Sequence, residues 1–121
     1  MRLIDARARE RYRGDLEPVD AAPGHIPTAH SLPTAGNLGP DGRFLAPGVL
    51  RWRFETVAAG PADVVTSCGS GVTACHNALA MRLAGLPDPV LYPGSYSDWS
   101  GAGLPVATGD EPGEVPASLR R

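Results

Sequence analysis

Cys68 is the residue of this sequence best suited to nucleophilic chemistry. It follows a β-branched run at residues 63–67 and opens the segment 68–74, which reads Cys-Gly-Ser-Gly-Val-Thr-Ala. The two glycines let the backbone curl so that successive N–H groups point at one centre, where they can hold an anion. A cysteine at the mouth of such a loop, ahead of a helix N-terminus, is expected to populate the nucleophilic thiolate.

Two alternative roles for Cys68 compete with that of the reactive nucleophile. Cysteines are among the most buried residue types, so a purely structural thiol is the ordinary alternative, but the nearby glycines and the strand-to-helix position favour a reactive one. Cysteine phosphatases place an arginine six residues after the cysteine to grip the phosphoryl oxygens. Ala74 stands there in this chain, so a phosphatase or an arsenate reductase is the least favoured of the three roles considered for Cys68.

The remaining candidates for chemistry give weaker signals. Cys75 lies in the first turn of the helix expected after the loop, and its spacing favours a core thiol over a resolving cysteine. His25, His30 and His76 lack the spacing of a metal site, and two cysteines supply few sulfur ligands, so no metal is expected. Nothing in the sequence requires a cofactor.

The elements that must position the loop are short apolar runs between glycine-rich and proline-rich stretches. Strands are expected at residues 3–5, 29–32, 63–67 and 89–92, the last one buried, and helices at residues 6–13, 47–57, 73–84 and 95–99. Strands that alternate with helices indicate an α/β fold with a parallel sheet. Cys68 then stands at the carboxyl end of a strand, where such sheets place ligand chemistry.

The length and composition of the chain indicate one globular domain. Of the 121 residues, 42% are hydrophobic and 20% charged, and no apolar run approaches the roughly 18 residues of a membrane span. The net charge is -2, without any block of like charges, which argues against nucleic-acid binding. The absence of a leader pattern and the reduced cysteines favour the cytoplasm. A catalytic domain is expected at residues 1–108 and a flexible tail at 109–121.

Five segments of the chain resemble the C-terminal, catalytic domain of the two-domain rhodanese family. They are residues 3–7, 11–14, 23–27, 68–76 and 92–99. The loop text is similar to that of the 3-mercaptopyruvate sulfurtransferase branch, whereas members that use thiosulfate typically carry Arg-Lys after the cysteine. The resemblance implies a rhodanese-like domain with a central parallel sheet flanked by helices. Because the family's preceding strand and helix are not in the sequence, the first edge element of the sheet is expected to be missing.

The resemblance also implies a reaction. Cys68 would take a sulfur atom from 3-mercaptopyruvate or thiosulfate as a persulfide and pass it to cyanide or to a thiol, such as that of a thioredoxin-like protein. Arg11 matches an arginine that in the family contacts the substrate carboxylate. The anion would be held by the backbone of the loop residues Gly69, Ser70, Gly71, Val72, Thr73 and Ala74.

Departures from the family pattern keep a second function open. Ser70 matches a serine that assists proton transfer in the family, but its histidine and aspartate partners come from an N-terminal rhodanese-like domain outside this sequence. Val19 stands where many mercaptopyruvate enzymes have a second arginine, and Thr28 replaces the usual glycine after His-Ile-Pro. A rhodanese-like module that binds or regulates, with little or no turnover, is therefore the main alternative.

Overall fold

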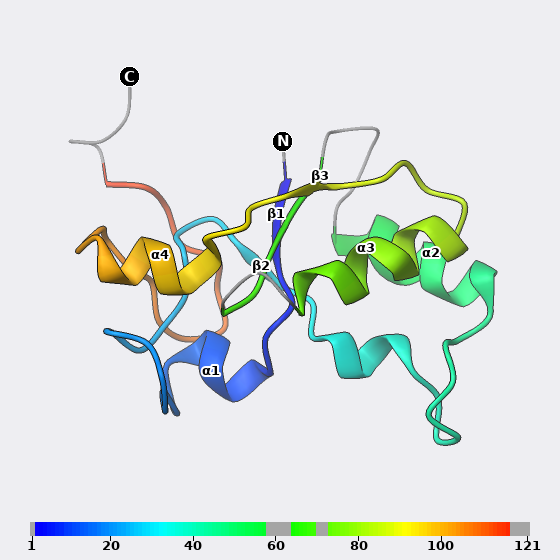
Figure 1. Ribbon diagram of the computed structural model, residues 1–121, viewed down its shortest axis with the longest axis horizontal. Helices are drawn as coiled ribbons and strands as arrows, with labels where there is room; N and C mark the ends of the chain where they lie inside the picture. Colours follow the sequence, from blue (N-terminus) through cyan, green and yellow to red (C-terminus); the bar gives the residue numbers. More distant parts are fainter. Residues whose placement is uncertain (1, 58–63, 70–72, 117–121) are drawn as a thin grey trace.

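The chain folds around a parallel β-sheet (Figure 1). The structure is a computed structural model that describes residues 2–57, 64–69 and 73–116. Within these residues the sheet has four strands in the order β2-β1-β3-β4. The strands are β1 (Arg2–Asp5), β2 (His30–Ser31), β3 (Val64–Ser67) and β4 (Val90–Leu91). Every pair of neighbours is parallel, and β1 pairs with β3 along its whole length.

Helices cover both faces of this sheet. In the described part of the chain they are α1 (Arg9–Arg13), the 3-10 helix η1 (Thr34–Asn37), α2 (Pro47–Val57), α3 (Ala74–Leu83) and α4 (Ser95–Gly101). Figure 1 shows α2 and α3 together on one side of the strands and α1 and α4 together on the other. The α/β fold with a central parallel sheet flanked by helices is thereby confirmed.

Each face of the sheet has its own hydrophobic core. Side chains alternate across a strand, so Ile4 packs with Leu50 and Phe54 of α2, while Leu3 packs against the opposite cluster. Leu50 and Phe54 are four residues apart, which puts them on one face of α2. The opposite cluster is built on the aromatic rings of Tyr12 and Tyr96, both fully buried. None of the described helices is both long and apolar enough to cross a membrane.

Two expectations about the elements were wrong. The helix expected at residues 6–13 begins only at Arg9, because Ala8 is extended, with a ψ of 148°. The strand expected to be buried at residues 89–92 is instead an exposed edge: Val90 is 60% exposed and Leu91 37%. β4 is a two-residue strand at the edge of the described sheet, where it pairs with β3.

The C-terminal segment packs against α1 and the loop before β2, and within the expected tail the Pro112 carbonyl accepts a hydrogen bond from the Thr28 N–H at 2.9 Å. His25 and Ala107 exchange two backbone hydrogen bonds, and the Gly109 N–H donates to the Arg13 carbonyl at 2.8 Å. Gly24 has a φ of +123°, and a β carbon there would lie 2.3 Å from the Ala107 carbonyl oxygen, so only glycine fits this approach. The division into a domain at 1–108 and a flexible tail at 109–121 stays a prediction.

Candidate functional site

Cys68 lies at the carboxyl end of the sheet, directly after β3. Its side chain is packed with Ala6, which follows β1, and with Ala74, the first residue of α3, and Cys68 is only 1% exposed. The strand, loop and helix therefore follow one another as the sequence predicts. Of the loop residues, Gly69, Thr73 and Ala74 lie in this junction, whereas the expected anion-holding residues Ser70, Gly71 and Val72 lie outside the described residues.

The start of α4 holds the backbone around Cys68. The Cys68 N–H donates to Ser95 Oγ at 3.0 Å, and the Tyr96 N–H donates to the Cys68 carbonyl at 3.0 Å. The Ser97 N–H donates to the Gly69 carbonyl at 2.8 Å. Both backbone hydrogen-bonding groups of Cys68 are thus bound to one short helix on another part of the chain.

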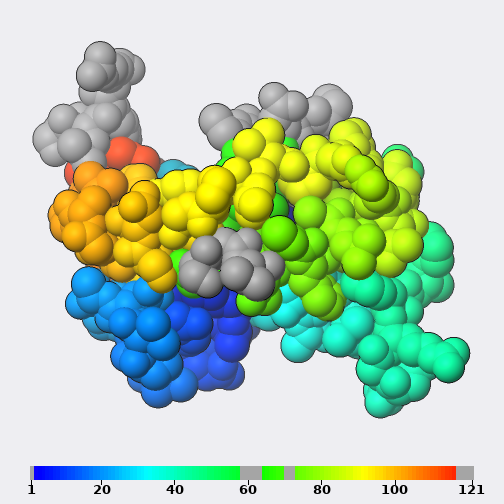
Figure 2. Space-filling view, in the orientation of Figure 1, coloured from blue at the N-terminus to red at the C-terminus, as the bar shows by residue number. Residues whose placement is uncertain are grey.

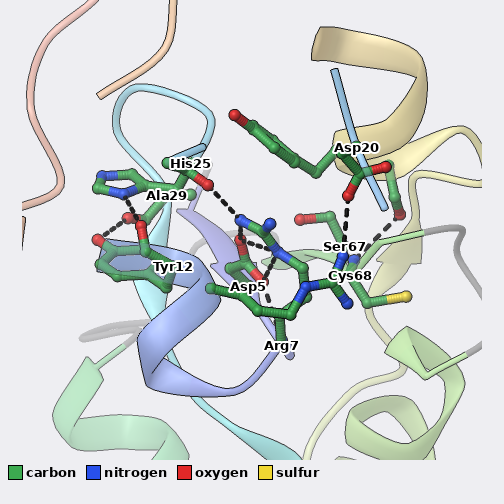
Figure 3. A network of polar contacts seen from close by, with 12 residues as sticks. Asp5, Arg7, Tyr12, Asp20, His25, Ala29, Ser67 and Cys68 are labelled. Atoms are coloured by element: carbon green, nitrogen blue, oxygen red, sulfur yellow. Dashed lines mark hydrogen bonds and ion pairs between the residues drawn. The ribbon is translucent and has the colours of Figure 1, made fainter. Parts of the chain in front are cut away.

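A buried arginine, Arg7, lies next to this junction (Figure 3). Its Nη2 donates to Asp5 Oδ2 at 2.8 Å and to the Gly24 carbonyl at 2.7 Å, and its Nη1 reaches Glu17 Oε1 at 3.4 Å. The guanidinium also stacks over the ring of Tyr96, 4.1 Å from the centroid. Arg7 and Asp5 are each only 1% exposed, so each charge depends on the other for its compensation.

Arg11 reaches the first residue of the loop. A β carbon on Gly69 would lie 3.4 Å from Arg11 Nη2, so the guanidinium lies directly against the residue that follows Cys68. Arg11 Nη2 donates to Asp20 at 2.9 Å and to Glu17 at 3.3 Å. Arg11 Nε is buried without a hydrogen-bond partner among the described residues, whereas the side chain as a whole is 24% exposed.

The charges around the loop nearly compensate one another. Burial alone would raise the pKa of Glu17, but hydrogen bonds from the Asp20 and Val19 N–H groups, together with the charges of Arg11 and Arg7, hold it below its usual value. Glu17 is therefore ionised at neutral pH and shares both guanidiniums. The charges of Arg7 and Arg11 are thus largely offset by those of Glu17 and Asp20.

The structure brings three of the expected site residues together and places Cys75 differently from the prediction. Cys68, Gly69 and Arg11 lie in one place, as the sequence predicts. The expectation that Cys75 is a core thiol was wrong, because Cys75 is exposed. The buried face of α3 consists of Ala74, Asn77, Ala80 and Met81. Among the described residues, neither cysteine forms a disulfide.

Sequence reasoning missed the side chains that support Cys68 and Arg11. These are the buried Arg7, the carboxylates of Glu17 and Asp20, and the serines at the start of α4, Ser95 and Ser97. Arg7 offered one local signal, since it follows Asp5 by two residues at the end of a strand. Asp20 and Ser97 offered none, because the hydrogen bond that joins them spans 77 residues.

The surface view places the supporting elements around the junction. Figure 2 shows α1, in blue, directly below α4, in orange, on the same face of the molecule. The Arg11 guanidinium comes from α1, and the hydrogen bonds to Cys68 come from α4. The site is therefore built where these two helices meet the carboxyl end of β3.

Comparison with known proteins agrees with this arrangement. The profile of the Rhodanese family, described as a rhodanese-like domain, matches residues 1–102. The chain is 54% identical over 111 residues to a Pseudomonas aeruginosa protein named "Probable 3-mercaptopyruvate sulfurtransferase", covering 89% of this chain and 39% of that protein. It is 39% identical over 101 residues to the thiosulfate sulfurtransferase of Bos taurus, and the match covers 80% of this chain and 34% of that protein.

A solved structure shows the same likeness in three dimensions. The 3-mercaptopyruvate sulfurtransferase from Leishmania major superimposes with a TM-score of 0.69 at 39% identity, covering 84% of this chain and 30% of that one. The chain thus spans well under half the length of each of these relatives. The profile match includes both Cys68 and Arg11, and the chain belongs to the rhodanese family.

Proposed function

We propose that this chain is a sulfurtransferase domain in which Cys68 accepts a sulfur atom as a persulfide and passes it on. The observation that carries the proposal is the Arg11 guanidinium against Gly69, the residue that follows Cys68. A cation beside a strand-end cysteine suits a donor that is an anion. Relatives named for 3-mercaptopyruvate and for thiosulfate support the same reaction class.

The proposed first step moves one sulfur atom. The Cys68 thiolate attacks the sulfur of 3-mercaptopyruvate, an S–S bond forms, and the C–S bond breaks with its electron pair going to carbon. That carbon takes the proton of the donor's thiol, so pyruvate leaves and a Cys68 persulfide anion remains. Arg11, whose side chain is 24% exposed, holds the donor's carboxylate, and loop N–H groups hold the persulfide.

The second step regenerates the Cys68 thiolate. A thiolate acceptor attacks the outer sulfur of the persulfide, and Cys68 leaves as its thiolate. A thioredoxin-like protein in the cytoplasm and cyanide are the acceptors we propose. An N-terminal rhodanese-like domain is a further proposed partner, since the relatives are more than twice as long as the stretch that this chain matches.

Mass spectrometry of the folded chain tests the proposal. After incubation with 3-mercaptopyruvate, and separately with thiosulfate, the protein should gain the mass of one sulfur atom at Cys68. Cys68→Ser should gain none, because a hydroxyl does not ionise near neutral pH. Cys75→Ser is the matched control and should gain sulfur like the unmodified chain, because Cys75 lies on the exposed face of α3. A folded chain that takes up no sulfur from either donor refutes the proposal.

A binding or regulatory module is the second candidate. The observation that favours it is the pairing of Arg11 with both Asp20 and Glu17, which already compensates the cation expected to hold the donor. The two candidates differ in one measurement. A module of this kind binds the donor in a calorimeter without releasing pyruvate, whereas a transferase releases one pyruvate for each Cys68 that is loaded.

A further inference from the structure

Ser95 has a backbone conformation that serine rarely adopts. Its φ is +52°, in the left-handed region, where the β carbon of an ordinary residue crowds the backbone. It is also fully buried. Glycine would take this conformation without strain, so the presence of a side chain here calls for a compensating contact.

The hydroxyl of Ser95 supplies that contact at Cys68. Ser95 Oγ accepts the Cys68 N–H at 3.0 Å and donates its own proton to the Tyr92 carbonyl at 2.7 Å. Both hydrogen-bonding roles of the hydroxyl are therefore used inside the protein. Glycine at this position would relieve the backbone and leave the Cys68 N–H buried without an acceptor.

We propose that Ser95 is a positioning residue for the nucleophile: its hydroxyl fixes the backbone of Cys68 so that the thiol meets the sulfur donor correctly. This inference rests on the proposed function. The Cys68 N–H is held by Ser95 and the Cys68 carbonyl by the Tyr96 N–H. With both groups held by α4, the backbone dihedrals of Cys68 are restrained, and so is the direction of its Cα–Cβ bond.

Gly94, the residue before Ser95, contributes to the tight packing that brings Ser95 close to Cys68. A β carbon on Gly94 would lie 2.6 Å from Cβ of Asp98, so the first turn of α4 is packed tightly on its preceding residue. Ser95 then begins the helix directly under the end of β3, where the Tyr92 carbonyl is within reach of its hydroxyl. Misplacing a reacting group by about 1 Å costs on the order of a hundredfold in rate, so a small shift of Cys68 is measurable.

The experiment compares three substitutions in α4, each in a Cys75→Ser background so that Cys68 is the one cysteine left. Ser95→Ala removes the hydroxyl and keeps the strained β carbon. Ser95→Gly removes both. Ser100→Ala is the control, because Ser100 is buried in the same helix and its Oγ has no hydrogen-bond partner within the described residues.

Three quantities are measured for each folded variant: kcat and KM for pyruvate release, the rate of Cys68 alkylation by iodoacetamide across pH, and the thermal midpoint. Ser95→Ala and Ser95→Gly should both lower kcat about tenfold or more with little change in KM. Alkylation should slow in both. Ser95→Gly should melt higher than Ser95→Ala because it relieves the left-handed backbone. Ser100→Ala should keep the parent's kcat and alkylation rate.

The glycine variant separates positioning from general stability. If kcat and alkylation recover in Ser95→Gly together with the thermal midpoint, or if Ser95→Ala matches Ser100→Ala in rate, the inference is wrong. If Ser95→Ala does not fold, Ser95→Gly carries the test alone against Ser100→Ala. A parent chain that alkylates at Cys68 and never takes up sulfur refutes the proposed function instead, and the alkylation rates still decide whether Ser95 positions the thiol.

Discussion

Replacing Thr28 with glycine should stabilise this protein. Thr28 has a φ of +83°, in the left-handed region, and it follows His-Ile-Pro, where the family resemblance predicts glycine. Its side chain is exposed, so the substitution removes no buried contact. The hydrogen bond from the Thr28 N–H to the Pro112 carbonyl, at 2.9 Å, belongs to the backbone and remains possible with glycine.

Two opposing contributions set the magnitude. Left-handed backbone costs a residue with a β carbon about 1–2 kcal/mol, and β-branching does not reduce that cost. Glycine loses more backbone freedom on folding, which costs about 0.5–1 kcal/mol. The difference stabilises the folded state by about 0.5–1 kcal/mol. For a domain of this length, each kcal/mol of added stability raises the thermal midpoint by about 4 °C, so the midpoint should rise by about 2–4 °C.

Thermal unfolding followed by circular dichroism at one scan rate measures this shift, and Gly42→Ala is the reverse control. Gly42 has a φ of +75°, and a β carbon there would meet no atom within 4 Å, so its substitution adds backbone strain and little else. Gly42→Ala should lower the midpoint by about the amount that Thr28→Gly raises it. A Thr28→Gly midpoint equal to or below that of the parent, with Gly42→Ala lowered, would refute the strain argument.

Three further predictions concern charge and the second cysteine. Arg7→Met should lower the free energy of unfolding in urea by about 3–5 kcal/mol at neutral pH, because buried Asp5 and Glu17 lose their partner. This loss should shrink as the pH falls through the carboxylate range, since the lowered pKa of Glu17 stabilises the fold only while that carboxylate is ionised. Burial, followed by the charge of a neighbouring arginine, lowers the pKa of His30. The contribution of neutral His30 to stability is therefore present above its ordinary pKa of about 6.5 and is lost as the pH falls through the folded-state value. His30→Gln should remove this loss, so the thermal midpoint should depend less on pH between about pH 7.5 and 5.5. Cys75→Ser should leave the thermal midpoint unchanged, because Cys75 is exposed; a large fall in the midpoint would contradict its placement.

The part of the site that could be predicted from the sequence is the part with local signals. The β-branched run before Cys68 and the glycines after it determine a strand and a loop through the preferences of neighbouring residues. The exposure of β4 has no such signal, because Val90 and Leu91 read as a buried strand until the neighbours in the sheet are known. Strand order is a property of the whole fold.

Cys75 shows why a helix face is hard to assign from one sequence. The buried face of α3 includes Asn77, a polar residue that interrupts the apolar pattern. Asn77 Oδ1 accepts a hydrogen bond from Asn37 at 2.7 Å, and its own Nδ2 donates to the Leu32 carbonyl at 3.0 Å. Those partners come from distant segments, so they cannot be foreseen from the local pattern. The apolar pattern alone therefore predicts the wrong buried face for α3 and places Cys75 on it.

One element ties the nucleophile to the cation of the proposed site. Helix α4 holds the Cys68 backbone through Ser95, and its Ser97 hydroxyl donates a hydrogen bond to Asp20. Asp20 in turn accepts the hydrogen bond from Arg11 at 2.9 Å. Because Asp20 shares its two carboxylate oxygens between Ser97 and Arg11, a shift of α4 displaces the thiol and the guanidinium together. In the proposed reaction the donor contacts both groups, and both are linked by hydrogen bonds to the first turn of α4, which lies outside the Cys68 loop.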